Sequence, residues 1–366
     1  MKNTFGTSVS ITLFGESHGA AIGCVLDGIA PGIPVDEDYI AAQMSLRRSV
    51  AALSTPRKER DEVKILSGVY RGKTTGTPIC MTIENQNTHS ADYQKTADLL
   101  RPGHADYTAR VKYGGYADPN GGGHFSGRIT AGLVAAGAIA LTALRGKGIT
   151  VGTHIAACGG VCDRPFSPDP REEIAMLSAM PFAVLDGAAG AAMQERITAA
   201  REVGDSVGGI LESAVCGLPA GVGEPWFDTL EGVISHILFS VPAVKGVEFG
   251  DGFALAAMRG SEANDPFRAE DGRILTATNR MGGILGGISN GMPLRIRTAI
   301  KPTPSISVPQ ESVNMATGEN AEISVVGRHD PAIVHRARVV ADSAIALALC
   351  DMLSLRFGTD YLKPND

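Results

Sequence analysis

An apolar stretch of 14 residues at 131–144 sets the strongest limit on the architecture of this chain. The stretch is rich in glycine and alanine and is followed by Arg145. A helix that crosses a membrane needs about 20 strongly apolar residues, so this stretch is too short for one. The sequence therefore predicts a buried helix at 131–144.

Both strands and helices are predicted around this helix. Alternating apolar residues predict a strand at 8–14, and Asp36 is typical of the N-cap of a helix that runs toward Arg48. Further strands are predicted at 22–27, 63–70 and 78–83, and further helices at 191–203, 226–240 and 337–356. The mixture predicts one large α+β or layered α/β body. Because no repeat or linker is found, we expect a single domain over residues 1–366.

Composition excludes several classes of protein. The 33 Lys and Arg residues against 39 Asp and Glu give a net charge of −6, and charged residues make up only 20% of the chain. Proteins that bind nucleic acid through bulk charge carry a basic excess, so we expect no nucleic-acid partner. Hydrophobic residues reach 44%, which is ample for a sizeable core and argues against disorder.

The N-terminus and the cysteines indicate a reducing compartment. The first residues lead straight into a strand-like segment without the features of a signal peptide, so we expect a cytoplasmic protein with no membrane partner. Six cysteines in 366 residues are too dilute for a disulfide scaffold. Cys158 and Cys162 have no second pair and no His-x-x-His nearby, so no metal site is predicted.

Three histidines in polar loops are the first candidates for function. A single histidine of this kind is more often structural, but three in loops rich in glycine or proline favour a functional role. Each stands beside an arginine or an acid: His18 next to Glu16 and Ser17, His104 near Arg101 and Asp106, and His329 between Arg328 and Asp330.

A glycine-rich loop and several arginines predict an anion pocket. The loop at 121–130 leads directly into the buried helix, whose first backbone N–H groups are therefore available to an anion. Clustered arginines in an acidic chain would form a local positive region suited to a small polyanion, although surface salt bridges are the alternative for each one. Dinucleotide, P-loop and zincin motifs are absent from the sequence, which disfavours those classes. The arginines are Arg47, Arg48, Arg57, Arg101, Arg128 and Arg328.

Three segments resemble the signature motifs of the chorismate synthase family. They are Gly15-Glu-Ser-His-Gly19, Gly123-His-Phe-Ser-Gly-Arg-Ile-Thr130 and Arg328-His-Asp-Pro331. Similar agreement is found at Arg101-Pro-Gly-His-Ala-Asp106 and at 204–209, 241–246, 282–291 and 301–303. These matches follow one order along the chain.

The resemblance implies a reaction, a cofactor and an architecture. The family removes phosphate from 5-enolpyruvylshikimate 3-phosphate by 1,4-anti elimination to give chorismate, and it needs reduced FMN although no net redox change occurs. The implied fold is an α+β sandwich in which a helical core lies between antiparallel sheets, and the implied assembly is a homotetramer. Because the chain has no dinucleotide fingerprint, we expect an external flavin reductase as a partner.

The resemblance also implies roles for individual residues. His18 matches the histidine that protonates the departing phosphate, and His104 matches the one that protonates or hydrogen-bonds the reduced flavin. Asp330 matches the carboxylate that accepts a proton from flavin N5, relayed through serines that match Ser17 and Ser126.

Two further groups of residues match binding positions of the family. Arginines that would bind the substrate phosphate and carboxylates are Arg47 or Arg48, with Arg101, Arg128 and Arg328. Residues in the implied flavin site are Ser126, Gly127, Arg128, Asn279, Gly282, Gly286, Gly287, Lys301, Ser305 and Arg328. Tight turns are the alternative interpretation of these glycines.

Two other functions stay open at this point. Ala52 and Asp342 depart from the family pattern, which leaves a catalytically idle flavin- or phosphate-binding relative as one alternative. The other is a metal-dependent phosphohydrolase that uses His18, His104 and Asp330, although these residues lack the spacing of a ligand set.

Overall fold

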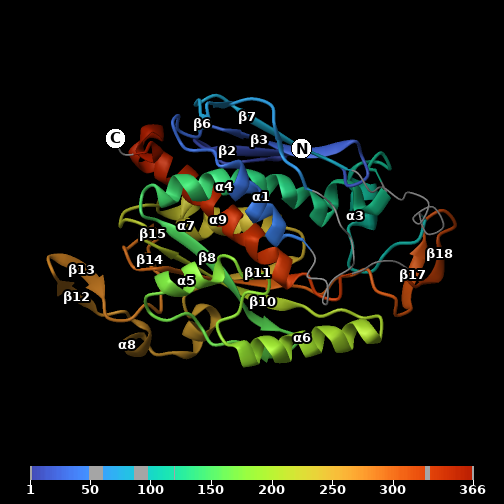
Figure 1. Cartoon of the computed structure of the whole chain (residues 1–366). Helices are drawn as coiled ribbons and strands as arrows, with labels where there is room; N and C mark the ends of the chain where they lie inside the picture. The colour runs from blue at the N-terminus through green and yellow to red at the C-terminus, as the bar shows by residue number, and fades with distance from the viewer. Residues whose placement is uncertain (1, 49–60, 86–97, 119, 326–329, 365–366) are drawn as a thin grey trace.

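A computed structural model describes residues 2–48, 61–85, 98–118, 120–325 and 330–364. A layer of helices lies between two five-stranded sheets, one above it and one below it in the view of Figure 1. All neighbouring strands in both sheets run antiparallel. The α+β sandwich that the resemblance implies is therefore confirmed.

The first sheet is built from the N-terminal part of the chain. Its strand order is β1-β2-β3-β7-β4. Its central strand, β3, has almost no exposed side chains because α4 covers one face of the sheet. The strands are β1 (Thr4–Phe5), β2 (Ser10–Gly15), β3 (Ala21–Asp27), β4 (Lys64–Ile65) and β7 (Ile79–Glu84).

The helical layer forms the core of the molecule. The predicted buried helix is α4 (Thr130–Arg145), which packs on the first sheet, while α9 (Val334–Phe357) packs on the second. The two helices approach closely at Gly137, where an added Cβ would lie 2.2 Å from Ser343 Cβ. The layer is completed by α1 (Glu37–Leu46) and α7 (Leu230–Ser240).

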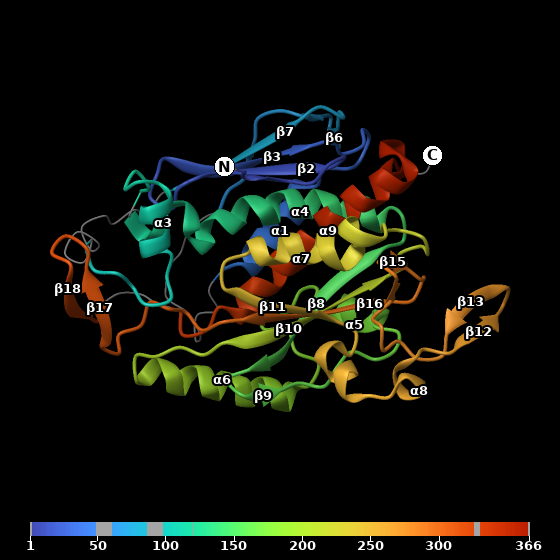
Figure 2. The same cartoon turned by 180° about the vertical axis from the view of Figure 1, so that it is seen from behind.

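The second sheet closes the other side of the helical layer. Its strand order is β11-β16-β10-β8-β9, and α5 (Arg171–Leu177) and α6 (Gly187–Glu202) lie against it on the side away from α9 (Figure 2). The strands are β8 (Thr150–Cys158), β9 (Val161–Cys162), β10 (Gly209–Cys216), β11 (Val244–Phe249) and β16 (Leu294–Ile300).

Small hairpins and short helices make up the rest of the described structure. The short helices are α3 (Asp106–Lys112) and α8 (Gly260–Ala263), with 3-10 turns η1 (Asn120–Phe125), η2 (Gly127–Ile129), η3 (Trp226–Asp228), η4 (Gly252–Ala257) and η5 (Thr359–Leu362). The hairpin strands are β5 (Val69–Tyr70), β6 (Lys73–Thr74), β12 (Phe267–Glu270), β13 (Arg273–Thr276), β14 (Ile284–Leu285), β15 (Ile288–Ser289), β17 (Gln310–Asn314) and β18 (Glu319–Ile323).

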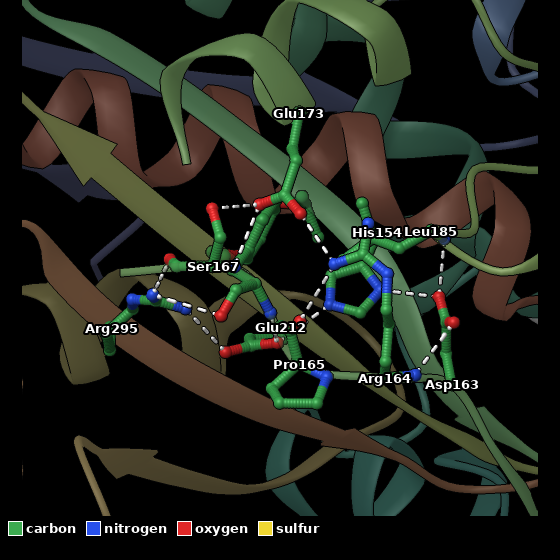
Figure 3. Close-up of polar contacts among 12 residues, drawn as sticks. His154, Asp163, Arg164, Pro165, Ser167, Glu173, Leu185, Glu212 and Arg295 are labelled. Atoms are coloured by element: carbon green, nitrogen blue, oxygen red, sulfur yellow. Dashed lines mark hydrogen bonds and ion pairs between the residues drawn. The ribbon is translucent and has the colours of Figure 1, made fainter. Parts of the chain in front are cut away.

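A buried polar network fastens a loop to the outer face of the second sheet (Figure 3). The His154 side chain is fully buried, with Nδ1 3.0 Å from Asp163 Oδ2 and Nε2 2.7 Å from Glu212 Oε2. Glu212 Oε1 accepts a hydrogen bond from Arg295 Nη1 at 3.1 Å. Arg295 also donates to the carbonyl of Phe166 at 3.3 Å. The buried carboxylates of Asp163 and Glu212 are tolerated here because each one accepts several hydrogen bonds.

Two predicted elements are corrected by the structure. The strand expected at 63–70 is divided into β4 and β5, because Gly68 turns the chain with a φ of 79° against Ile79. The helix expected at 226–240 is divided into η3 and α7 at Thr229, whose hydroxyl caps α7 by accepting the Gly232 N–H at 2.9 Å.

Within the described residues, one helical segment, Gly127–Arg145, begins before the predicted apolar stretch and is, by length and composition alone, long enough to cross a membrane. Its most apolar window is 83% buried inside the protein, as expected for a core helix.

Candidate active site

A cavity of about 920 Å³ opens where α4 begins, α7 ends and α9 begins. Its volume is at the upper end of the usual range for small-molecule sites. Predicted site residues that line it are Arg47, Arg48, Arg101, His104, Ser126, Gly127, Arg128, Lys301, Ser305 and Asp330. Residues far apart in the sequence are thus brought to one space.

The lining of the cavity is strongly positive. Among the described residues that line it, eight are lysine or arginine and two, Asp61 and Asp330, are acidic. This concentration occurs in a chain whose net charge is −6. The cavity therefore has the local charge that attracts and holds a small polyanion, as the arginine pattern predicts.

Two of the predicted histidines pack against adjacent glycines of one turn. An added Cβ on Gly121 would lie 2.0 Å from His18 Cε1, and one on Gly122 would lie 3.1 Å from His104 Cε1. Both glycines have a positive φ, of 60° and 99°, which other residues adopt only with strain. The turn must therefore be glycine both for its backbone shape and for the space that the two rings occupy.

The two predicted serines both form hydrogen bonds with this turn. Ser17 Oγ lies 3.0 Å from His18 Nδ1 and donates to the carbonyl of Asn120 at 3.2 Å. Ser126 caps η2 by accepting the Arg128 N–H at 3.3 Å, and its backbone N–H donates to Gly123 at 3.4 Å. Ser17 and His18 do not line the cavity, whereas Gly121, which packs against the His18 ring, does.

His104 is oriented by a carboxylate. Its Nδ1 lies 2.6 Å from Asp106 Oδ1, and Arg101 binds both oxygens of that carboxylate, from Nη2 at 2.6 Å and from Nε at 2.8 Å. Burial raises the pKa of Asp106, but the hydrogen bonds from Arg101 and His104 outweigh this effect and hold the pKa well below its usual value. Asp106 is therefore a permanent anion that fixes both neighbours.

Two of the predicted arginines share a second carboxylate. Asp61 is buried between Arg47, whose Nη1 donates to Oδ2 at 3.0 Å, and Arg128, whose Nη1 donates to Oδ1. Arg47 Nη2 also donates to Thr130 Oγ1 at 3.1 Å, and Arg128 Nε donates to Asn85 Oδ1 at 3.1 Å. Both guanidinium groups are therefore held on more than one side.

Asp330 is held at the cavity by the start of α9. Its carboxylate accepts a hydrogen bond from Arg336 Nη1, while Arg336 Nε donates to the backbone carbonyl of Arg47 at 2.6 Å. The same contact therefore links Asp330 to the end of α1.

Lys301 joins the opposite wall of the cavity to the loop of His104. Its ammonium group donates to the carbonyl of Gly103. Burial and the nearby Lys245 lower the pKa of Lys301. Because Lys245 also lines the cavity, this wall presents two ammonium groups to a bound anion.

Four predicted flavin-site residues do not line this cavity. Asn279 donates to the carbonyl of Pro293 at 2.8 Å, and Gly282 packs against Gly250 in the same region. Gly286 and Gly287 form the turn of the β14–β15 hairpin, where Gly287 packs against Thr229. Their flavin role stays a prediction.

Other predicted positions lie outside the described residues. These are Ala52, Arg57, Arg328 and His329. Asp342, the other departure from the family pattern, lies in the core, where it accepts a hydrogen bond from Thr153 Oγ1 at 2.6 Å. It does not line the cavity, so the departure affects packing in α9.

Several cavity residues were missed by sequence reasoning. Asp61 and Arg336 pair with residues that are distant in sequence or separated by a loop, and no periodic pattern marks them. Lys245 lies within the family-like segment 241–246 and could have been selected for its charge. Lys2 and His236 carried no signal. Within the described residues, no group of three or more His, Cys, Asp or Glu side chains is placed to hold a metal ion.

The sequence is similar to known proteins over nearly its whole length. The family model of chorismate synthase matches residues 9–354. A chorismate synthase of Dehalococcoides mccartyi is 48% identical over 360 residues, which cover 98% of both chains. One of Thermococcus kodakarensis is 46% identical over 351 residues, or 96% of this chain and 97% of the other.

A solved structure extends the likeness to three dimensions. A crystal structure of chorismate synthase matches with a TM-score of 0.77 and 27% identity, covering 96% of this chain and 94% of the other. The three motifs and the sandwich fold lie within these matches, which span nearly the whole length of the chain. This chain belongs to the chorismate synthase family.

Proposed function

We propose that this protein is a lyase that eliminates phosphate from 5-enolpyruvylshikimate 3-phosphate to give chorismate, with reduced FMN as cofactor. The observation that carries this proposal is the convergence of His104, Arg47, Arg128 and Asp330 on one cationic cavity. The substrate carries a phosphate and two carboxylates, so it matches the charge of this lining.

The residues present fit a flavin as well as the substrate. The cavity, at about 920 Å³, is near the upper end of the range for small-molecule sites. Lys245 and Lys301 offer charge to a phosphate at one wall of the cavity. Reduced FMN, when bound, supplies electron density that assists loss of the poor phosphate leaving group, with no net redox change.

The arginines bind and orient the substrate in this proposal. A contact between unit charges about 4 Å apart is worth about 4 kcal/mol at an effective dielectric constant of about 20, against about 1 kcal/mol in water. Exclusion of water from the cavity therefore matters for binding. Substrate anions are held by Arg47, Arg48, Arg101, Arg128 and Arg328.

Two histidines and one carboxylate handle protons. His18 donates a proton to the departing phosphate, and the Ser17 hydroxyl beside it orients the ring. His104, fixed by Asp106, donates to the flavin. When reduced FMN is bound, Asp330 would accept the proton of flavin N5, with Ser17 and Ser126 as hydrogen-bonding relays.

Assembly and location follow from the same proposal. One hydrophobic cluster includes residues from Val9 to Leu362, which supports a single domain over residues 1–366. We propose a cytoplasmic homotetramer that receives reduced flavin from an external reductase.

Anaerobic turnover tests the function. The protein is mixed with 5-enolpyruvylshikimate 3-phosphate and photoreduced FMN without oxygen, and phosphate and chorismate are measured. We expect equal amounts of both products with reduced FMN, none with oxidised FMN, and no effect of a chelator. Flavin binding without turnover would indicate an idle relative, and chelator-sensitive release without flavin would indicate a phosphohydrolase.

A further inference from the structure

Asp61 is an unexpected group in a cavity that is built for anions. It is one of the two acids among the described lining residues, and its side chain is only 7% exposed. A buried carboxylate at this position repels a polyanionic substrate, so its presence requires a compensating role. The contacts of Asp61 indicate that role.

The two carboxylate oxygens bind two different guanidinium groups. Arg47 donates to Oδ2 at 3.0 Å and Arg128 donates to Oδ1, and the side chains of both arginines are at most 10% exposed. Two buried cations that share a site repel each other, and each needs a partner to offset the loss of hydration. A carboxylate between them reduces the repulsion and offsets the lost hydration of both cations.

The remaining contacts set the direction of each guanidinium. Arg47 is held from the helix start by Gly127 at 3.2 Å and Thr130 at 3.1 Å. Arg128 is held from the first sheet by Asn85 at 3.1 Å and the Glu84 carbonyl at 3.3 Å. Asp61 is the group that these two sets of contacts have in common. Because a guanidinium is a rigid planar fork, contacts on two sides fix its orientation.

We propose that Asp61 is a positioning residue that holds Arg47 and Arg128 together and oriented before the substrate arrives. This inference rests on the proposed function of the cavity. Prior orientation spares the substrate the cost of ordering two long side chains, each of which carries about 2 kcal/mol of rotamer entropy when free. The repulsion from one paired carboxylate is the smaller effect, since its charge is already neutralised by two cations.

The test replaces the carboxylate by a neutral group of the same shape. In Asp61→Asn, we expect KM for 5-enolpyruvylshikimate 3-phosphate to rise about tenfold or more, with kcat changed by less than about threefold, because ground-state binding is lost. The dissociation constant of the same substrate, measured by calorimetry without flavin, should rise to a similar extent. Asp61→Ser, which leaves room for water, should give the same result if the asparagine variant does not fold.

A matched control separates positioning from general loss of stability. Glu212→Gln removes another buried carboxylate that binds an arginine, on the outer face of the second sheet and away from the cavity. It should lower the midpoint of thermal unfolding and leave KM unchanged.

An unchanged or tighter dissociation constant in a folded Asp61 variant would overturn the inference and mark Asp61 as a competing anion. Failure of the proposed function is a separate outcome. In that case the wild-type protein would release no phosphate with reduced FMN, whatever the Asp61 variants bind.

Discussion

Gly121 and Gly122 decide where the two histidine rings of the site can lie. Their positive φ values and the space taken by His18 and His104 are two independent reasons for glycine. The sequence alone indicated a glycine-rich anion loop at this position. It could not show that the histidines of two other loops pack against it, because such contacts are set by tertiary structure.

Gly121→Ala should lower turnover by about 100-fold or more, since a misplacement of about 1 Å at a reacting group has an effect of that size. The added methyl group would meet the His18 ring at 2.0 Å, so the ring or the turn must move. Initial rates of phosphate release under anaerobic conditions measure this. Gly187→Ala is the control, because nothing lies within 4 Å of its added methyl group. Equal rates for the two variants would contradict the role of the turn.

His18→Ala should lower turnover by about 10²- to 10⁴-fold, the range for removal of a general acid. Binding of 5-enolpyruvylshikimate 3-phosphate should change little, because the arginines that line the cavity remain. Single-turnover kinetics and calorimetry measure the two quantities separately. Turnover near the wild-type rate would remove His18 from the mechanism.

At the scale of elements, features set by neighbouring residues were predicted well, and features set by contacts between distant residues were not. Asp36 caps α1 by accepting the Tyr39 N–H at 3.0 Å, as its sequence context predicted. The division of 226–240 was missed although Asp228 and Thr229 interrupt the apolar residues there, and Trp226 adopts a φ of 69° that no sequence pattern marks. Ion pairs such as Asp61 with Arg128 join segments 67 residues apart and were equally out of reach.

The contact between α4 and α9 tolerates no larger residue at Gly137. Gly137→Ala would place a methyl group 2.7 Å from the Ser343 backbone, so the helices must separate, which costs about 1–3 kcal/mol. This outweighs the gain of about 1 kcal/mol in helix propensity. Urea unfolding should show the loss, whereas Gly187→Ala in α6 should be neutral or stabilising. A Gly137→Ala variant as stable as the wild type would contradict the close packing.

The start of α9 makes stability depend on pH. Burial, helped by Arg336 and opposed by Asp330, lowers the pKa of His335 from 6.5 to about 4. As pH falls from 6.5 to 4, His335 is protonated in the unfolded chain but stays neutral in the folded protein. The free energy of unfolding therefore falls by about 3 kcal/mol over this range. Below pH 4 both states bind the proton and this contribution is constant.

His335→Gln should remove that dependence. The variant loses ring packing against Phe182, so its stability at pH 7 should be lower than that of the wild type. Its free energy of unfolding should nevertheless fall less steeply between pH 6.5 and 4. Urea titrations at several pH values measure both slopes, and parallel curves would show that His335 is not the group responsible.

At the scale of the whole molecule, the charge around the cavity is opposite in sign to the net charge of the chain. A chain with a net charge of −6 concentrates lysine and arginine around one cavity, where the helical layer ends between two sheets. The composition argued against a nucleic-acid partner, and the motifs indicated the family and its sandwich fold. Which arginines meet, and which carboxylates hold them, required the three-dimensional arrangement.

The central claim is that one cavity holds both the substrate and the flavin. A crystal structure of the protein with 5-enolpyruvylshikimate 3-phosphate and FMN tests this most directly. We predict that both ligands occupy the cavity lined by His104, Arg128 and Lys301, with the substrate anions on the arginines. Either ligand bound outside this cavity would contradict the account.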